Sequence, residues 1–206
     1  WFGSVLTWPV RRGVAASLEG RLSAVEIEEV LTAAQADLLP GLEREAAQRG
    51  PSGIVAIDWI NGRRYPFEDA SATAALLGLR IGHDAVDLYR AVVQSAVLGS
   101  RAIVDAIPAE IVDAQRIILV GGIAKRSPMI CQALADALDA EVMVSPADEV
   151  CARGAAIYAA VAAEAFGSVP DAQAALCEDY QVDYRPTAAG RDEYRRAFAD
   201  YQRACA

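Results

Sequence analysis

The sequence predicts an α/β fold, a mixed sheet with flanking helices in which part of the sheet is parallel. Two observations support this prediction. In the second half of the chain, short apolar runs alternate with helical patterns, which is the order of a strand–helix–strand unit. The 206 residues are 54% hydrophobic and 23% charged, so the chain is long and apolar enough to bury a core.

In the first half, one long helix precedes one buried strand. Residues 23–48 have helical spacing, and Ser23 followed by Glu26 is a capping-box pattern. After a glycine–proline break, residues 54–60 form a short β-branched run that is typical of a buried strand. The strand ends at a turn, residues 61–66, that carries two arginines.

A second long helix is expected over residues 85–107, after an irregular or weakly helical stretch at 71–80. Asp84 is a suitable N-cap, and Pro108 marks the end of the helix or a new start. The residues expected on its buried face are Val86, Tyr89, Val93, Ala96, Ser100 and Ile103.

The second half is more regular than the first. Its expected elements are a strand at 116–120, a helix at 128–138, a strand at 141–144 and a helix at 146–165. The last of these helices is rich in small residues, so we expect it to pack closely against a neighbour. The tail after residue 170 is polar, and a terminal helix is expected from Arg191.

Charge, hydropathy and cysteine content argue against several classes of function. The net charge of -9 and the pI near 4.7 disfavour a nucleic-acid partner. No apolar run is as long as a membrane span, and the first residues do not resemble a signal peptide; they suggest a chain entered midway. Four cysteines without a CxxC pair, and His83 as the single histidine, give little support for zinc. Cys131 and Cys151 are expected to be buried free thiols in a reducing cytoplasm.

Gly121 and Gly122, directly after the strand at 116–120, are the strongest local signal of a ligand site. Glycines at this place let the backbone approach a ligand, and the helix that follows offers unpaired N–H groups to an anion. The string is neither GxGxxG nor GxxxxGK[ST], so spacing alone favours a structural turn over a ligand loop. Arg63 and Arg64 are a second candidate for a phosphate contact, with solvated surface charge as the favoured interpretation.

Five stretches, taken in order, resemble the C-terminal domain of the FGGY carbohydrate kinases, and most closely its ribulokinase branch. They are WFGSVLTWPV with AAQADLLPGL, IDWINGRRYP, LYRAVVQSAVLGSRAIVDAI, ILVGGIAKRSPMICQALADAL and DEVCARGAAIYAAVAA. Each string alone is weak evidence, but five strings in the same order are specific. The resemblance is strong from Trp1 to Ala163 and weaker in the tail.

The resemblance implies an actin-like ATPase fold of the ribonuclease-H-like type, in which two domains close on a cleft. Residues 1–166 would be the nucleotide-binding domain and residues 167–206 a helical tail packed on it, with the sugar-binding and catalytic domain outside this chain. The implied reaction is transfer of a phosphoryl group from ATP, with Mg²⁺, to the terminal hydroxyl of the ketopentose ribulose, as in L-arabinose catabolism. A kinase for xylulose or glycerol and a non-catalytic assembly domain are the alternatives, and a homodimer is left open.

The resemblance implies that this chain contains nucleotide contacts. It implies no catalytic residue and no metal ligand here. Gly121 and Gly122 are implied to let the backbone reach the α-phosphate and ribose of ATP. The residues implied to border the adenosine are Ala124, Lys125 and Ser127, and Gly62 corresponds to a loop glycine near the nucleotide. The 206-residue chain alone is therefore expected to be inactive as a kinase.

Overall fold

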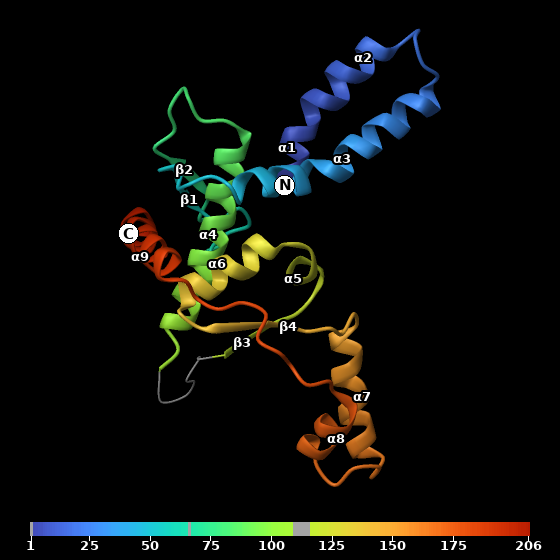
Figure 1. The fold of residues 1–206 in the computed structure, drawn as a ribbon, viewed down its shortest axis with the longest axis vertical. Helices are drawn as coiled ribbons and strands as arrows, with labels where there is room; N and C mark the ends of the chain where they lie inside the picture. Colours follow the sequence, from blue (N-terminus) through green and yellow to red (C-terminus); the bar gives the residue numbers. More distant parts are fainter. Residues whose placement is uncertain (1, 66, 109–115) are drawn as a thin grey trace.

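The computed structural model describes residues 2–65, 67–108 and 116–206, and it has a mixed α/β arrangement (Figure 1). Its first part contains α1 (Phe2–Pro9), a π-helical turn η1 (Val10–Val14), α2 (Ala15–Leu18), α3 (Ala24–Ala46), β1 (Val55–Ile57), β2 (Ala75–Leu77) and α4 (Ala85–Asp105). Its second part contains β3 (Arg116–Leu119), α5 (Gly122–Arg126), α6 (Pro128–Leu138), β4 (Glu141–Val144), α7 (Val150–Ala162), α8 (Val169–Leu176) and α9 (Ala188–Cys205). None of the described helices is both long and apolar enough to cross a bilayer.

The parallel pair of β3 and β4, with α6 in the connection between them, is the strand–helix–strand unit that the sequence predicts. Ile117 pairs with Val142, and Leu119 pairs with Val144. The bounds of α6 and β4 agree with the prediction, and β3 ends one residue earlier than predicted. Helix α6 packs on both β4 and α4, so this unit is joined to the core of the chain.

The stretch at 71–80 is irregular as predicted except at its centre, where the prediction is wrong because β2 lies there. Ala75 pairs antiparallel with Ile57, and Leu77 pairs with Val55, so β2 covers one edge of β1. Strand β1 is itself only three residues long, shorter than the predicted run of 54–60. A strand of three residues is too short to show alternation in the sequence, and its pairing partner is remote.

Helix α4 is the central element of the packing, because α3, α6, α9 and β1 all pack against it. Val86, Tyr89 and Val93 are buried as predicted, whereas Ala96 is exposed and Ile103 is 44% exposed. The other buried residues of the helix are Ala91, Ser95, Val97 and Leu98. A single stripe does not describe a helix that is covered on several sides, which is why the second half of the predicted face is wrong.

The C-terminal helix α9 is part of the core. It begins three residues earlier than predicted, where the Thr187 side chain accepts a hydrogen bond from the N–H of Gly190 at 3.0 Å. Its buried aromatic residues Tyr194, Phe198 and Tyr201 form one cluster with residues of α4 and α6. The Tyr201 hydroxyl also donates to Asp58, directly after β1, at 2.7 Å.

Helix α7 does not pack as closely as its small residues suggest. It begins at Val150, four residues later than predicted, and Ile157 is its one fully buried residue. Its main neighbour is α8, and Figure 1 shows these two helices set apart from the other elements at the lower right. Cys151 is accordingly exposed, contrary to expectation, while Cys131 in α6 is a buried free thiol as expected.

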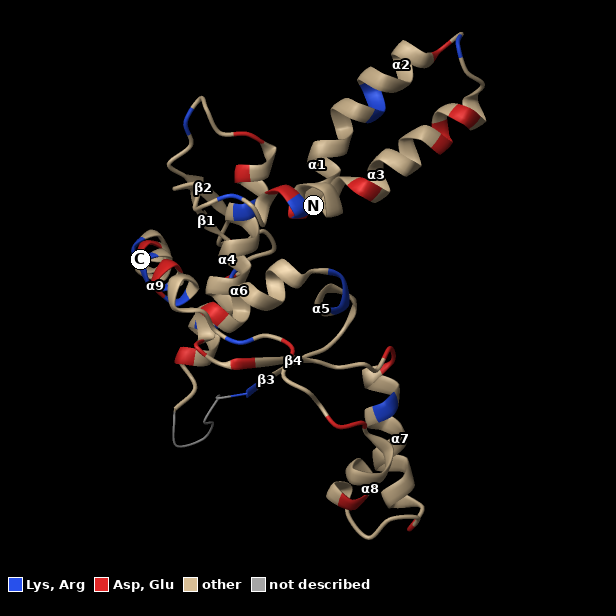
Figure 2. Cartoon of the chain, viewed as in Figure 1, with Lys and Arg blue, Asp and Glu red and all other residues tan. Residues whose placement is uncertain are grey.

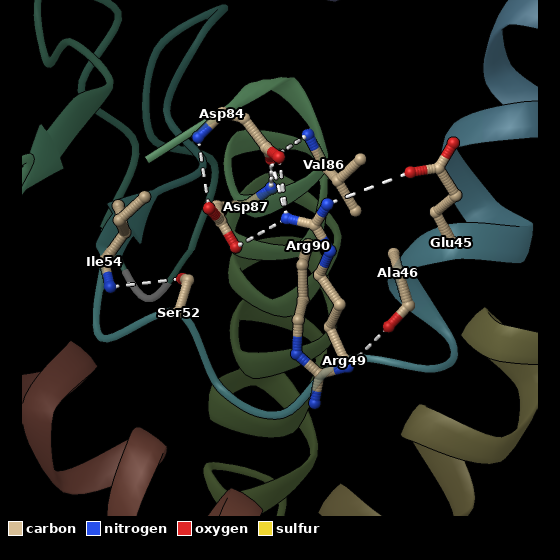
Figure 3. A network of polar contacts seen from close by, with 9 residues as sticks. All are labelled: Glu45, Ala46, Arg49, Ser52, Ile54, Asp84, Val86, Asp87 and Arg90. Atoms are coloured by element: carbon tan, nitrogen blue, oxygen red, sulfur yellow. Dashed lines mark hydrogen bonds and ion pairs between the residues drawn. The ribbon is translucent and has the colours of Figure 1, made fainter. Parts of the chain in front are cut away.

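A polar network joins the end of α3 to the start of α4 (Figure 3). The predicted N-cap Asp84 accepts hydrogen bonds from the N–H groups of Val86 at 2.9 Å and Asp87 at 3.1 Å. Its own N–H donates to the Asp87 side chain at 3.1 Å, which completes a capping box. Arg49 donates to Asp84 at 2.8 Å, and this hydrogen bond lowers the pKa of the carboxyl group. Arg90 adds a bond to the carbonyl of Ala46 at 3.1 Å, so the two helices are fixed relative to each other.

Candidate functional site

The carboxyl ends of β3 and β4 form the candidate site, because ligands of open α/β sheets bind beyond this edge. Strand β3 leads into Gly121 and Gly122, and β4 leads into Ser145. The N–H of Ser145 donates to the carbonyl of Leu119 at 2.9 Å, so the two loops start from a fixed pair of strand ends. We call residues 120–126 the glycine loop.

Gly121 gives the glycine loop its backbone conformation. Its φ of 90° and ψ of 177° lie in a region that glycine alone adopts without strain. Apart from its two chain neighbours, no atom of the described residues lies within 4 Å of the position that a Cβ would occupy, so the backbone is open on this side. Gly122 differs, since its φ lies outside the left-handed region and a Cβ there would be 2.5 Å from Nη2 of Arg126, a flexible side-chain end.

Lys125 ties the glycine loop to the segment after β4. Its Nζ donates to the carbonyl of Pro146 at 2.8 Å and to Oδ1 of Asp148 at 2.5 Å. The hydrogen bond and the charge of Lys125 lower the pKa of Asp148. Figure 2 shows α5 as a short basic segment, and Arg126 in it donates from Nε to the carbonyl of Gly122 at 3.0 Å. The cations of the loop therefore have partners within the protein.

Ala124 and Ser127, also expected at the site, have side chains that face the interior. Both are buried, and Ser127 is 5% exposed. The carbonyl of Ala124 accepts a hydrogen bond from the Cys131 thiol at 3.3 Å. Burial and the charge of Glu43 raise the pKa of this thiol. These two side chains therefore add little to the exposed surface of the site.

The start of α6 has no free N–H group to offer an anion, contrary to expectation. Pro128 has no N–H, and the N–H of Met129 donates to Oε1 of Glu43 at 3.2 Å. The N–H of Ile130 donates to Oγ of Ser127, and that of Cys131 to the Ser127 carbonyl, each at 3.2 Å. These donors are satisfied within the protein, so a ligand has to meet the glycine loop itself.

The start of the glycine loop is where backbone donors remain available. The N–H groups of Gly122 and Ile123 have no hydrogen-bond partner among residues 2–65, 67–108 and 116–206. Val120 and Ile123 are more than half exposed, so apolar surface lies next to these donors. Unpaired N–H groups beside apolar surface are suited to a ligand that carries both an anionic and an aromatic part.

Gly62 lies in the loop between β1 and β2, and it also needs to be glycine. Its φ is 75°, and a Cβ would come within 3.0 Å of the Ala70 Cα. Within the described part of the chain, no hydrogen bond or ion pair joins this loop to the glycine loop. Arg63 lies 5.1 Å above the Trp59 ring, and Arg64 pairs with Glu68 at 3.4 Å, which agrees with partly solvated surface charge.

Among the residues that the structure describes, the other titratable groups do not form a second site. The Nδ1 of His83 accepts from the N–H of Arg80 at 3.0 Å, so the histidine has a structural role. Nowhere in the described ranges do three or more His, Cys, Asp or Glu side chains form a group that could hold a metal ion. Sequence reasoning missed Glu43, whose contacts with α6 cross more than 80 residues and leave no local signal.

The model of the FGGY family of carbohydrate kinases, C-terminal domain, matches residues 2–163. A ribulokinase from Vibrio parahaemolyticus is 34% identical over 204 residues, which are 98% of this chain and 35% of that protein. A ribulokinase from Halalkalibacterium halodurans is 27% identical and covers 97% of this chain and 35% of its own length. The chain thus spans about a third of the length of these relatives.

Solved sugar kinases share the fold. A xylulose kinase from Rhodospirillum rubrum covers 93% of this chain and 37% of its own, with a TM-score of 0.62 and 25% identity. A glycerol kinase from Plasmodium falciparum, solved with ADP, covers 86% of this chain and 36% of its own, with a TM-score of 0.64 and 15% identity. The predicted actin-like ATPase fold is confirmed by these neighbours.

Proposed function

The chain belongs to the FGGY family of carbohydrate kinases, and we propose that it is the nucleotide-side domain of an ATP-dependent kinase for ribulose. The observation that supports this substrate is the extent of the likeness to ribulokinases. The Vibrio parahaemolyticus protein aligns over 98% of the chain, so the likeness includes the C-terminal region beyond residue 163, where the family model ends. The reaction we propose is phosphoryl transfer from ATP to the terminal hydroxyl of ribulose, in the cytoplasm.

We divide the chain into a nucleotide-binding domain, residues 1–166, and a C-terminal tail, residues 167–206, that packs on it. The buried contacts of α9 with α4 and α6 support the packing. The sugar-binding and catalytic groups would lie in an N-terminal domain outside these 206 residues. This arrangement puts the catalytic carboxylate in the other domain, so the isolated chain would bind nucleotide weakly and transfer no phosphoryl group.

The proposed nucleotide contacts are in the glycine loop. The open backbone at Gly121 and the unpaired N–H groups at the start of α5 fit an α-phosphate and ribose. Ala124, Lys125 and Ser127 would border the adenosine, the first and last through backbone, since their side chains are buried. Gly62 is a further proposed contact. ATP would supply the transferable phosphoryl group, and the loop would orient its adenosine end.

A magnesium ion does not fit the described residues as a ligand set, because they contain no cluster of acidic, histidine or cysteine side chains that could hold one. We therefore assign no magnesium ligand to this chain. Phosphoryl transfer by such kinases depends on positioning and on charge stabilisation at the phosphates. The contribution of this chain would be positioning of the nucleotide.

A coupled kinase assay on the full-length protein tests the proposal. We expect ATP-dependent turnover with a higher kcat/KM for ribulose than for xylulose or glycerol, and no turnover by the 206-residue chain alone. Turnover of xylulose or glycerol without turnover of ribulose would contradict the substrate. No turnover of any of the three, together with no binding of ATP or ADP in calorimetry, would favour the non-catalytic assembly domain.

A further inference from the structure

The carboxylate of Glu43 joins three separate segments of the chain. Its Oε1 accepts hydrogen bonds from Oγ of Ser127 at 2.9 Å and from the N–H of Met129 at 3.2 Å. Its Oε2 accepts from the hydroxyl of Tyr89 at 3.3 Å. Glu43 lies near the end of α3 and Tyr89 lies in α4, so one side chain connects both helices to the junction of α5 and α6.

Burial makes these hydrogen bonds costly to lose. Ser127 is 5% exposed and Tyr89 is 8% exposed. Burial, followed by the charge of Glu43, raises the pKa of Tyr89 to about 12, so the hydroxyl stays protonated and donates. The negative charge also lies at the N-terminus of α6, where the helix dipole favours an anion. Glu43 itself is half-buried, and a hydrogen bond to a carboxylate is stronger than one between neutral groups.

Ser127 transmits the position of Glu43 to the glycine loop. Its N–H donates to the carbonyl of Ile123 at 2.9 Å and closes α5, while its hydroxyl accepts from the N–H of Ile130 at 3.2 Å and caps α6. The other end of the loop is fixed at Leu119 through the N–H of Ser145. Gly121 between these ends has no side chain, so the course of the loop depends strongly on where its ends are held.

We propose that Glu43 is a positioning residue for nucleotide binding, which holds the C-terminal end of the glycine loop through Ser127 and Met129. The role rests on the proposed function, because it assumes that the glycine loop meets the nucleotide. Glu43 accepts from the N–H of Met129, and Ser127 accepts from those of Ile130 and Cys131. With these donors of α6 satisfied, the start of α5 is left as the place where the nucleotide binds. Its removal weakens the affinity for nucleotide more than it weakens the affinity for sugar or the stability of the fold.

The test compares Glu43→Gln with Glu45→Gln in the full-length protein. The amide keeps the shape of the side chain but replaces one acceptor oxygen with a donor and removes the charge. We expect Glu43→Gln to raise the Kd for ADP and the KM for ATP by about tenfold, since hydrogen bonds to a charged group are lost. The KM for sugar is expected to change by less than about twofold. Glu45 lies two residues away, and its exposed side chain pairs with Arg49 at 3.8 Å. Its substitution is expected to leave these constants unchanged.

A second variant, Glu43→Asp, keeps the charge but shortens the reach by one methylene group, and we expect an intermediate Kd. This milder substitution serves also if Glu43→Gln does not fold. An ADP affinity that is unchanged in the folded variants would overturn the role of Glu43 and leave the proposed function intact. A parallel loss of ADP affinity, sugar affinity and thermal stability would overturn it too, because that is the effect of a merely structural residue. Absence of ADP binding by the wild type would instead overturn the proposed function itself.

Discussion

The substitution Gly121→Ala perturbs the glycine loop through its backbone alone. At φ 90° and ψ 177° an alanine is strained, and within the part of the chain that the structure describes no residue beyond its two chain neighbours comes within 4 Å of the added methyl group. A residue held in such a conformation costs about 1–3 kcal/mol. Because the loop is exposed, we expect it to relax in the free protein and to regain the native course only when nucleotide binds. The strain then appears as a loss of affinity, about 5- to 150-fold in the Kd for ADP.

Titration calorimetry of the full-length protein with ADP measures this loss, with Gly122→Ala as the matched control. The neighbouring glycine has no positive φ, and the atoms nearest to its added Cβ belong to the flexible guanidinium end of Arg126. We therefore expect a change in Kd of less than about threefold there. Equal losses in both variants would show that any added methyl group disturbs the site, and would refute the argument from backbone strain. An unchanged Kd in Gly121→Ala would refute it as well.

Two further predictions concern contacts around this loop and the core. Arg90 and Glu193 form an ion pair in which Nη2 and Oε1 are 2.6 Å apart and the side chains are 14% and 22% exposed. Glu193→Gln breaks this pair and should lower the free energy of unfolding by about 2 kcal/mol in a denaturant titration. An unchanged free energy of unfolding would mean that α9 is not held by this pair. The hydrogen bond from Lys125 is the main cause that lowers the pKa of Asp148. The stability that the ionised Asp148 contributes is therefore present at neutral pH and is lost as the pH falls through that lowered pKa. The stability difference between the wild type and Asp148→Asn should therefore shrink on acidification, and a difference that grows would contradict the pairing.

Local patterns in the sequence predicted local structure well. The capping box of Ser23 and Glu26, the N-cap Asp84 and the bounds of α6 all depend on residues within a few positions of each other, and all agree with the structure. The position of the two glycines after β3 was also evident from the sequence. That these glycines contact a nucleotide was inferred from the resemblance to a family, and this contact stays a prediction.

Features that depend on distant residues were not predictable. Strand β2 exists because β1 provides a pairing edge, and the buried face of α4 is set by α3, α6, α9 and β1 together. The contacts of Glu43 with Ser127 and Met129 bring together residues more than 80 positions apart. In α7, small residues indicated close packing, yet most of the helix is exposed, because residue size alone does not identify a packing partner.

Hydrogen exchange of the full-length protein with and without ADP tests the central claim most directly. If the glycine loop holds the nucleotide, the N–H groups at Gly121, Gly122 and Ile123 should exchange more slowly when ADP is bound. The amides of Met129 and Ile130, already hydrogen-bonded to Glu43 and Ser127, should change little. Saturable ADP binding that leaves the exchange of the glycine loop unchanged would contradict the account.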